Sequence, residues 1–362
     1  MRLRLLRIEL HYASGMVLHT AKSGAVPHLA ELRLVAEQSG EVVALGASRT
    51  NINYLTGQTQ DALEAEILSA CIALDWGVSW DSIAAQMDSR LSAISAPARM
   101  LFEMAAADGA AREAGMPLHQ WLGSGLPEIR STPTNQTLFW TDEATMLARA
   151  GAYAARGFLD LKLRIGIAHF AEDLRRLELL RGMLPPAATL SVDANGTWSA
   201  ANVGQRIKSL MPFRLAYLEQ PLPAEDWTAL TALPIMLDES LAGPADIARL
   251  IETRVAPLAH LKLAKLGGLD RLCAAARGLA DAGIGVMVGQ MNEGAVSTLA
   301  AAHAAIALAV PWRELYGADG LANEPARPVL RYTDGALQIP TGPGLGLSIH
   351  PSHGKLIWEQ SI

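Results

Sequence analysis

The chain has 362 residues, of which 50% are hydrophobic and 18% are charged, and its formal net charge is −6. This length exceeds what one hydrophobic core usually supports, so we expect one large domain and a smaller one. The negative charge gives no electrostatic reason to expect nucleic acid or an acidic membrane as a partner. No uncharged apolar run reaches the roughly 18 residues of a membrane-spanning helix. The first ten residues do not resemble a signal peptide, so we expect a cytoplasmic protein.

Several common kinds of site find no support in the sequence. Cys71 and Cys273 lie far apart in apolar helical patterns, so we expect buried free thiols rather than a disulfide. The histidines show no zinc-ligand spacing, and His303, in an alanine-rich pattern, is expected to be a core or surface residue. Neither a GxSxG nucleophile motif nor a GxGxxG dinucleotide motif follows a predicted strand.

The N-terminal part of the chain is predicted to be an α+β domain spanning residues 1–130. Three segments near the start have the near-alternation of half-buried strands, namely residues 3–10, 29–36 and 41–46. A small-residue loop containing Ser14, Gly15 and His19 separates the first two. From residue 60 to 116 apolar residues recur at helical spacing, so helices are expected to follow the strands.

From residue 131 onward, strand-like and helix-like segments alternate. About eight such strand signals occur up to residue 328, with helices expected between successive strands and a short final strand at residues 313–316. This rhythm favours a parallel (β/α) barrel over an open doubly wound sheet. The C-terminal segment, residues 329–362, contains extended stretches and is predicted to pack back on the N-terminal domain.

Three of the predicted barrel strands end in an acid: Asp193, Glu219 and Asp238. Residues at the carboxyl ends of barrel strands carry out the chemistry in folds of this kind. Carboxylate oxygens suit a hard cation such as Mg²⁺, so the three acids are predicted metal ligands. A single acid of this kind would more simply cap a helix, but three in succession favour a metal. Asn195 either orients a ligand or forms a turn with Gly196.

Two lysines interrupt apolar strands, where an unpaired ammonium is costly. Lys262 ends the strand that follows Asp238, and Lys162 lies in an earlier strand. A metal and a low dielectric would lower a lysine pKa and make it a usable base; the alternative is a lysine that reaches solvent. Arg164 points the same way as Lys162, and its high pKa suggests carboxylate binding or stabilisation of developing charge.

Two further residues are weaker candidates. Lys265 follows Lys262 by less than one helical turn and is expected to have a structural role in the next loop. Glu314, on the last predicted strand, either hydrogen-bonds a substrate or polarises a base.

With these residues in place, the chain resembles the enolase superfamily, and within it the muconate lactonizing enzyme subgroup. The resemblance covers nearly the whole chain and lies in an ordered series of motifs: residues 98–108, 115–123, 157–166, 192–195, 219–221, 238–240 and 262–268. Histidine marks strand 7 in mandelate racemase-like members, whereas this strand reads Met-Val-Gly-Gln at residues 287–290. That difference favours the lactonizing subgroup.

The resemblance implies a capping domain on a modified barrel, one essential Mg²⁺, and removal of the proton α to a substrate carboxylate with an enediolate intermediate. It makes Asp193, Glu219 and Asp238 the metal ligands and Lys262 a base. The loops at residues 14–19 and 48–54 would cover the site, so His19 and Tyr54 are candidate substrate residues.

Arg164 departs from the pattern, because the subgroup has a second basic lysine at this position. Epimerases of this type need a base on each face of the α-carbon. With Lys262 as the sole base, cycloisomerisation or β-elimination (dehydration by a lyase) becomes more plausible. Epimerisation stays open if Lys162 serves as a base, and so does a non-catalytic ligand-binding descendant.

The substrate is expected to be a small carboxylate. The cap loops have little charge apart from Arg49 and His19, which favours an apolar or cyclic body. A metal-free sugar-phosphate barrel is disfavoured, because no glycine-rich phosphate loop follows the late strands. Self-association into a homo-oligomer is expected from so alanine- and leucine-rich a chain.

Overall fold

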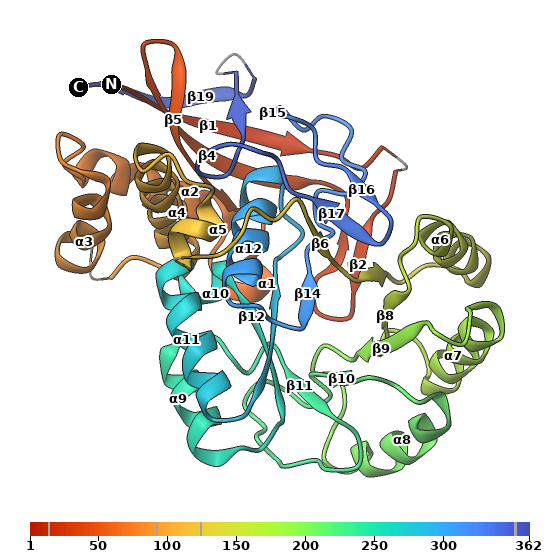
Figure 1. Ribbon diagram of the computed structural model, residues 1–362. Helices are drawn as coiled ribbons and strands as arrows, with labels where there is room; N and C mark the ends of the chain where they lie inside the picture. Colours follow the sequence, from red (N-terminus) through yellow and green to blue (C-terminus); the bar gives the residue numbers. More distant parts are fainter. Residues whose placement is uncertain (14, 92, 124, 351–352) are drawn as a thin grey trace.

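The cap is built on a four-stranded antiparallel sheet (Figure 1). The structure is a computed structural model that describes residues 1–13, 15–91, 93–123, 125–350 and 353–362. The strands lie in the order β19-β1-β4-β5, with β1 at Arg2–Leu10, β4 at Leu29–Gln38, β5 at Glu41–Arg49 and β19 at Lys355–Ser361. The predicted cap sheet is therefore confirmed, and the end of the chain completes it beside the N-terminus.

Helices follow the cap strands. They are α1 Asn53–Thr56, α2 Gln60–Ala73, α3 Trp80–Arg90, α4 Ala96–Glu113 and α5 Leu118–Leu122. Of these, α2, α3 and α4 lie where the sequence shows helical spacing. The loop predicted before residue 29 contains instead a small hairpin, β2 Leu18–Thr20 and β3 Gly24–Val26. Ser14 of that loop lies outside the described residues.

Eight parallel strands form a nearly closed barrel. In chain order they are β7 Gln136–Leu138, β8 Asp160–Arg164, β9 Thr189–Asp193, β10 Leu218–Glu219, β11 Ile235–Leu237, β12 Leu258–Lys262, β13 Gly285–Gly289 and β14 Trp312–Glu314. Hydrogen bonds link the two ends of this order: Asn135 N donates to Arg313 O (3.0 Å), and Leu315 N donates to Thr134 Oγ1 (2.8 Å). The predicted barrel is confirmed.

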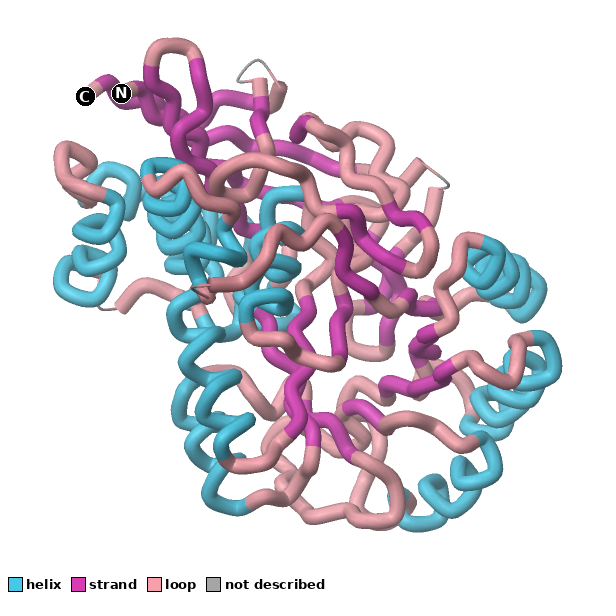
Figure 2. The backbone as a smooth tube through the Cα atoms, in the orientation of Figure 1, coloured by secondary structure: helices cyan, strands magenta, loops and turns pink. Residues whose placement is uncertain are grey.

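The barrel helices lie outside the strands, as Figure 2 shows. They are α6 Glu143–Ala155, α7 Phe170–Met183, α8 Val203–Leu210, η1 Met211–Phe213, α9 Pro244–Thr253, α10 Leu263–Leu266, α11 Leu269–Asp281 and α12 Ala295–Ala307. The expectation of a helix between successive strands is wrong in one place, because the described residues 220–234 contain no helix. Pro221, Pro223 and Pro234 lie there, and proline lacks the N–H that a helix interior requires.

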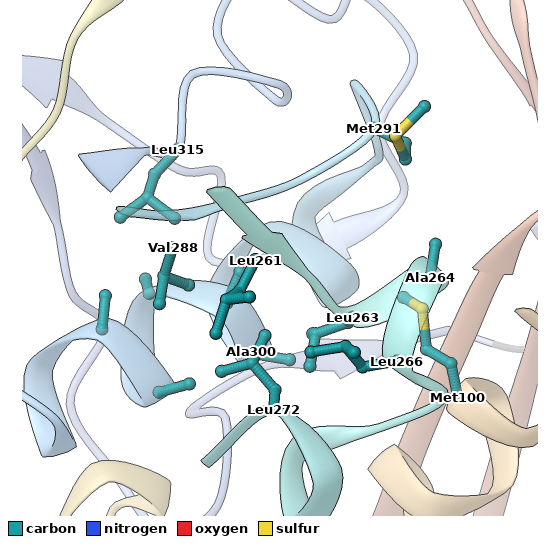
Figure 3. Packing of buried hydrophobic residues seen from close by; sticks show 14 of the residues in the cluster. Met100, Leu261, Leu263, Ala264, Leu266, Leu272, Val288, Met291, Ala300 and Leu315 are labelled. Atoms are coloured by element: carbon teal, nitrogen blue, oxygen red, sulfur yellow. The ribbon is translucent and has the colours of Figure 1, made fainter. Parts of the chain in front are cut away.

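The alternation of side chains along the strands separates the core from the site. Leu261 and Val288 point outward and lie in one apolar cluster with Leu272 of α11 and Ala300 of α12 (Figure 3). Their neighbours in β12 and β13 consequently point into the barrel. A second apolar cluster of Tyr217, Met236 and Met287 fills the barrel interior away from the strand ends.

The C-terminal segment contacts the cap, where Leu345 N donates to Asp108 Oδ1 of α4 (2.6 Å), and it also pairs with strands beyond residue 130. β16 Tyr332–Thr333 pairs with β17 Ala336–Gln338, and β17 pairs in turn with β6 Ser131–Pro133. β18 Ser348–Ile349 pairs with β15 Ala326–Arg327. Of the strands that the structure describes in this segment, only β19 joins the cap sheet, through β1. The domain limits at residues 130 and 328 stay predictions.

Two expectations about single residue types can be compared with the structure. Cys71 and Cys273 are buried free thiols. His303 is fully buried in α12, where its ring stacks on His119 with 5.2 Å between the ring centroids. In the part of the chain that the structure describes, none of the helices is long and apolar enough to cross a membrane.

A buried glutamate of the cap caps a barrel helix. Glu103 of α4 accepts hydrogen bonds from Leu269 N (2.6 Å) and Asp270 N (3.1 Å) at the start of α11. A Cβ on Gly268 would lie 2.5 Å from Glu103 Oε2, and the φ of Gly268 is 142°. A glycine is therefore needed at this junction for both space and backbone conformation.

The burial of Glu103 predicts a pH dependence of stability. Burial raises the pKa of Glu103 to about 7. Between its ordinary pKa and this value the folded protein binds more protons than the unfolded chain, so the free energy of unfolding falls as pH rises from about 4.5 to 7. We expect Glu103→Gln to flatten this decline in urea titrations at pH 5, 6 and 8. Equal slopes for wild type and variant would contradict the assignment.

Candidate active site

Neighbouring strand ends bring the predicted charged residues into one buried cluster. The parallel register sets Arg164 beside Asp193, and Asp193 beside Glu219. The members of the cluster, each at most 6% exposed, are Lys162, Arg164, Asp193, Glu219, Asp238, Lys262, Lys265 and Glu314. Four acids thus share the end of the barrel with four basic groups.

Lys162 lies among the acids, beneath the strand ends. Its Nζ donates to Glu219 Oε2 at 2.8 Å, forms an ion pair with Glu314, and lies 3.8 Å from Asp193 Oδ2. Burial would lower the pKa of Lys162, but Glu219 and Glu314 outweigh it and raise the pKa above its ordinary value. Arg164 forms an ion pair with Asp193 through Nη1. Both residues are therefore held as cations.

Asp238 binds two ammonium groups. Lys262 Nζ lies 2.5 Å from Asp238 Oδ2, and Lys265 Nζ lies 2.6 Å from both Oδ1 and the main-chain oxygen of Asp238. Lys265 also donates to His260 O at 2.9 Å. These bonds tie Lys265, which lies in α10 rather than in a loop, to the ends of β11 and β12.

The carboxylates around Lys262 oppose the effect of burial on its pKa. Burial would lower the pKa of Lys262, but Asp238, together with Glu219, raises it above its ordinary value. In turn, Lys262 and Lys265 overcome the effect of burial and hold the pKa of Asp238 well below its usual range. A cation that competed for Asp238 would remove the effect of this carboxylate on the pKa of Lys262 and free the lysine to act as a base.

Three residues that the sequence interpretation did not single out also belong to the site. His260 Nδ1 lies 2.9 Å from Glu219 Oε1. Gln220 Oε1 accepts from the main-chain N–H of Asp238 at 2.9 Å and so ties two strand ends together. Glu239 Oε1 accepts a hydrogen bond from Asn195 Nδ2 at 3.0 Å. Strand alternation could have revealed His260, because it lies two residues before Lys262 on the same inward face.

A cavity lies between the barrel mouth and the cap. Its barrel wall contains Phe139, Arg164, Asn195, Asp238, Glu239, Lys262, Gln290, Met291 and Asn292. Its cap wall contains Leu18, Thr20, Lys22, Ser23, Val26, Arg49, Tyr54 and Leu55. Of the four basic groups in the cluster, only Lys262 and Arg164 line the cavity. Lys162 lies behind this wall, completely buried.

The two predicted substrate residues of the cap differ in position. Tyr54 lines the cavity. His19 does not appear among the described residues of the wall, whereas its neighbours Leu18 and Thr20 do. Because side chains alternate along β2, His19 points away from the cavity while its neighbours face it. Its main-chain oxygen accepts a hydrogen bond from Trp140 N at 3.1 Å.

The donor groups at the strand ends suit a hard divalent cation. Oxygens of Glu219 and Asp238 and a ring nitrogen of His260 lie within 4.8 Å of one another. Asp193 is connected to this group through Lys162. Asn195 Oδ1 and Glu239 Oε2 are buried oxygens without a hydrogen-bond partner among the described residues. An oxygen-rich donor set of this kind fits Mg²⁺.

The geometry agrees with comparisons against known proteins. The family model of enolase C-terminal domain-like proteins matches residues 145–353. The chain belongs to this family. It is 32% identical to the L-Lys-D/L-Arg epimerase of Methylococcus capsulatus over 84% of this chain and 87% of that protein. It is 31% identical to muconate cycloisomerase 1-2 of Acinetobacter lwoffii over 70% and 67% of the two chains.

Solved structures of the family superpose over nearly the whole chain. The muconate lactonizing enzyme from Pseudomonas fluorescens, complexed with muconolactone, has a TM-score of 0.88 at 26% identity and covers 97% of this chain and 96% of its own. The L-Ala-D/L-Glu epimerase from Bacillus subtilis has a TM-score of 0.85 at 26% identity, with 96% and 98% coverage. The chain is thus an enzyme of the muconate lactonizing enzyme-like class. Superfamily members of this kind remove a proton next to a carboxylate.

Proposed function

We propose that this enzyme removes the proton α to the carboxylate of a small molecule, with Lys262 as the single base. The observation that supports this role is the cavity wall, where Lys262 is the only lysine at the barrel end among the described residues. Lys162, which could have served as a second base, is completely buried behind Asp193 and Glu219. A single base favours cycloisomerisation or β-elimination over epimerisation.

The metal role follows from the same cluster. Asp193, Glu219 and Asp238 would hold Mg²⁺, which when bound would neutralise the charge that develops on the substrate carboxylate. Lys262 takes the α-proton on Nζ and returns it, or passes it to a leaving group. Arg164, which stays protonated, faces the same cavity and stabilises negative charge on the substrate. Asn195 Oδ1 and Glu239 Oε2, which have no hydrogen-bond partner among the described residues, supply acceptor oxygens at the cavity wall.

The cavity wall also limits the substrate class. The charged residues of its cap side are Lys22 and Arg49, whereas its acids, Asp238 and Glu239, lie at the barrel end. A cationic group at the cap end of the substrate would be repelled. We therefore propose a small acid whose far end is apolar or anionic. Such a wall suits a cycloisomerase-like substrate better than the lysine and arginine in the name of the Methylococcus relative.

Solvent-deuterium exchange tests this proposal directly. The full-length enzyme with Mg²⁺ in D₂O is incubated with dicarboxylates, apolar monocarboxylates and dipeptides that carry free ammonium groups, and NMR follows the α-proton. We expect exchange or turnover in the first two groups and none with cationic dipeptides. If no acid exchanges, the chain is instead the non-catalytic ligand-binding descendant.

A substitution at Arg164 tests the single-base mechanism. In the wild type we expect a chiral substrate to exchange its α-proton without racemisation. Arg164→Lys places a second titratable amine at the cavity wall, so racemisation should appear at least about tenfold above the wild-type rate. Polarimetry or chiral chromatography measures it, with Arg164→Gln as the control that adds no base. Racemisation by the wild type would show that a second base already operates.

Two other expectations stay predictions. We propose a cytoplasmic location for the enzyme, and we propose self-association, for which the exposed Leu356 and Ile362 near β19 offer apolar surface. Analytical ultracentrifugation would test the second of these.

A further inference from the structure

We propose that His260 is a positioning residue that aims the carboxylate of Glu219, and that Gly289 reserves the space for its imidazole. This inference rests on the proposed function, in which Glu219 is a metal ligand. It concerns a pair of residues on β12 and β13, which are neighbouring strands of the barrel.

The imidazole and an ammonium hold the two oxygens of Glu219. His260 Nδ1 lies 2.9 Å from Glu219 Oε1, and Lys162 Nζ lies 2.8 Å from Glu219 Oε2. All three residues have no solvent exposure. An ionised carboxylate only accepts hydrogen bonds, so Nδ1 of His260 is the donor in this contact. Held on both sides, the carboxylate cannot rotate freely, which is the condition for a preorganised ligand.

Gly289 leaves room for this ring. A Cβ on Gly289 would lie 2.0 Å from His260 Nε2 and 3.0 Å from its Cε1. The φ of Gly289 lies outside the left-handed region, so its backbone conformation does not require glycine. The steric contact with His260 is therefore the reason that a larger residue is excluded.

The rest of the ring's environment argues against a purely structural role. His260 Nε2 is buried and has no hydrogen-bond partner among the described residues. A buried unpaired acceptor destabilises a fold. The neighbouring layer of the barrel interior is filled by apolar or aromatic side chains, those of Tyr217, Met236 and Met287. An apolar residue would serve packing at least as well as His260, so its benefit must lie in the bond to Glu219.

A double-mutant cycle on the full-length enzyme tests the pair. Isothermal titration calorimetry measures the Kd for Mg²⁺ of wild type, His260→Ala, Gly289→Ala and the double variant. We expect His260→Ala to raise the Kd about 10- to 100-fold, the usual effect of losing a residue that supports a metal ligand. Gly289→Ala should raise it at least about tenfold. The double variant should match His260→Ala, because the added methyl then has no ring to displace.

Two controls separate positioning from folding. Ser191→Ala removes another buried, unpartnered polar atom of the barrel interior and should leave the Kd unchanged. His260→Leu should raise the Kd while the thermal midpoint of the metal-free protein stays equal or increases. This second variant keeps the test decisive if His260→Ala folds poorly.

The outcomes distinguish this inference from the proposed function. If the wild type binds Mg²⁺ and His260→Leu binds it equally well, the positioning role is wrong and the proposed function stands. If the losses from Gly289→Ala and His260→Ala add fully in the double variant, Gly289 acts without His260, and their pairing is overturned. If the wild type does not bind Mg²⁺, the proposed function fails, and this inference fails with it.

Discussion

Lys262→Ala is expected to reduce α-proton exchange by at least about 10³-fold, within the range of general-base contributions. Lys262 is a lysine on the cavity wall at the carboxyl ends of the barrel strands. When a divalent cation binds Asp238, the amine of Lys262 loses the carboxylate that most strongly raises the lysine pKa. The measurement is loss of the α-proton signal in D₂O, with substrate and Mg²⁺ at saturation.

The control for this prediction is the affinity for metal. Because Lys262 competes with a cation for Asp238 Oδ2, removing it should leave the Kd for Mg²⁺ unchanged or lower it. Exchange that persists in Lys262→Ala would shift the base to another group. A variant that loses both exchange and metal binding would show that the lysine has a structural role.

The fold could be predicted from the sequence because its signals are local. The acids that end apolar segments fall at the strand ends, since buried parallel strands are short apolar runs. The missing helix after Glu219 has a local sign as well, in the prolines between residues 220 and 234. The regular alternation of strands and helices on either side of these prolines nevertheless favours a helix there.

Long-range charge pairing could not be predicted in the same way. Arg33 lies in an alternating strand pattern typical of a half-exposed strand, but it is completely buried. Its guanidinium binds Glu31 and, from the other end of the chain, Glu324 (Nη2 to Oε2, 2.8 Å). Nothing in the sequence around Arg33 indicates a partner that far away. The same limit applies to the electrostatics of Lys262, because the effect of Asp238 on its pKa depends on the three-dimensional arrangement of the two residues.

The electrostatics of the cluster lead to a second large effect. Asp238→Asn is expected to lower the free energy of unfolding of the metal-free protein by about 3–5 kcal/mol, because the buried ammonium groups of Lys262 and Lys265 lose their carboxylate. Urea unfolding in the presence of EDTA measures this change. The same variant should lose Mg²⁺ binding.

The next residue along the chain supplies a matched control for this prediction. Glu239 is also an acid at this strand end and is partly buried, but burial of its carboxyl group and the charge of Asp238 raise its pKa, so its ionised form is less favoured than that of Asp238. Glu239→Gln is therefore expected to change the free energy of unfolding by less than about 1 kcal/mol. Equal losses from the two variants would mean that burial alone, rather than the pairing of Asp238 with two lysines, sets the cost. A large loss confined to Asp238→Asn would show that this carboxylate balances the positive charge of the two lysines, for which a divalent cation bound there would compete with them.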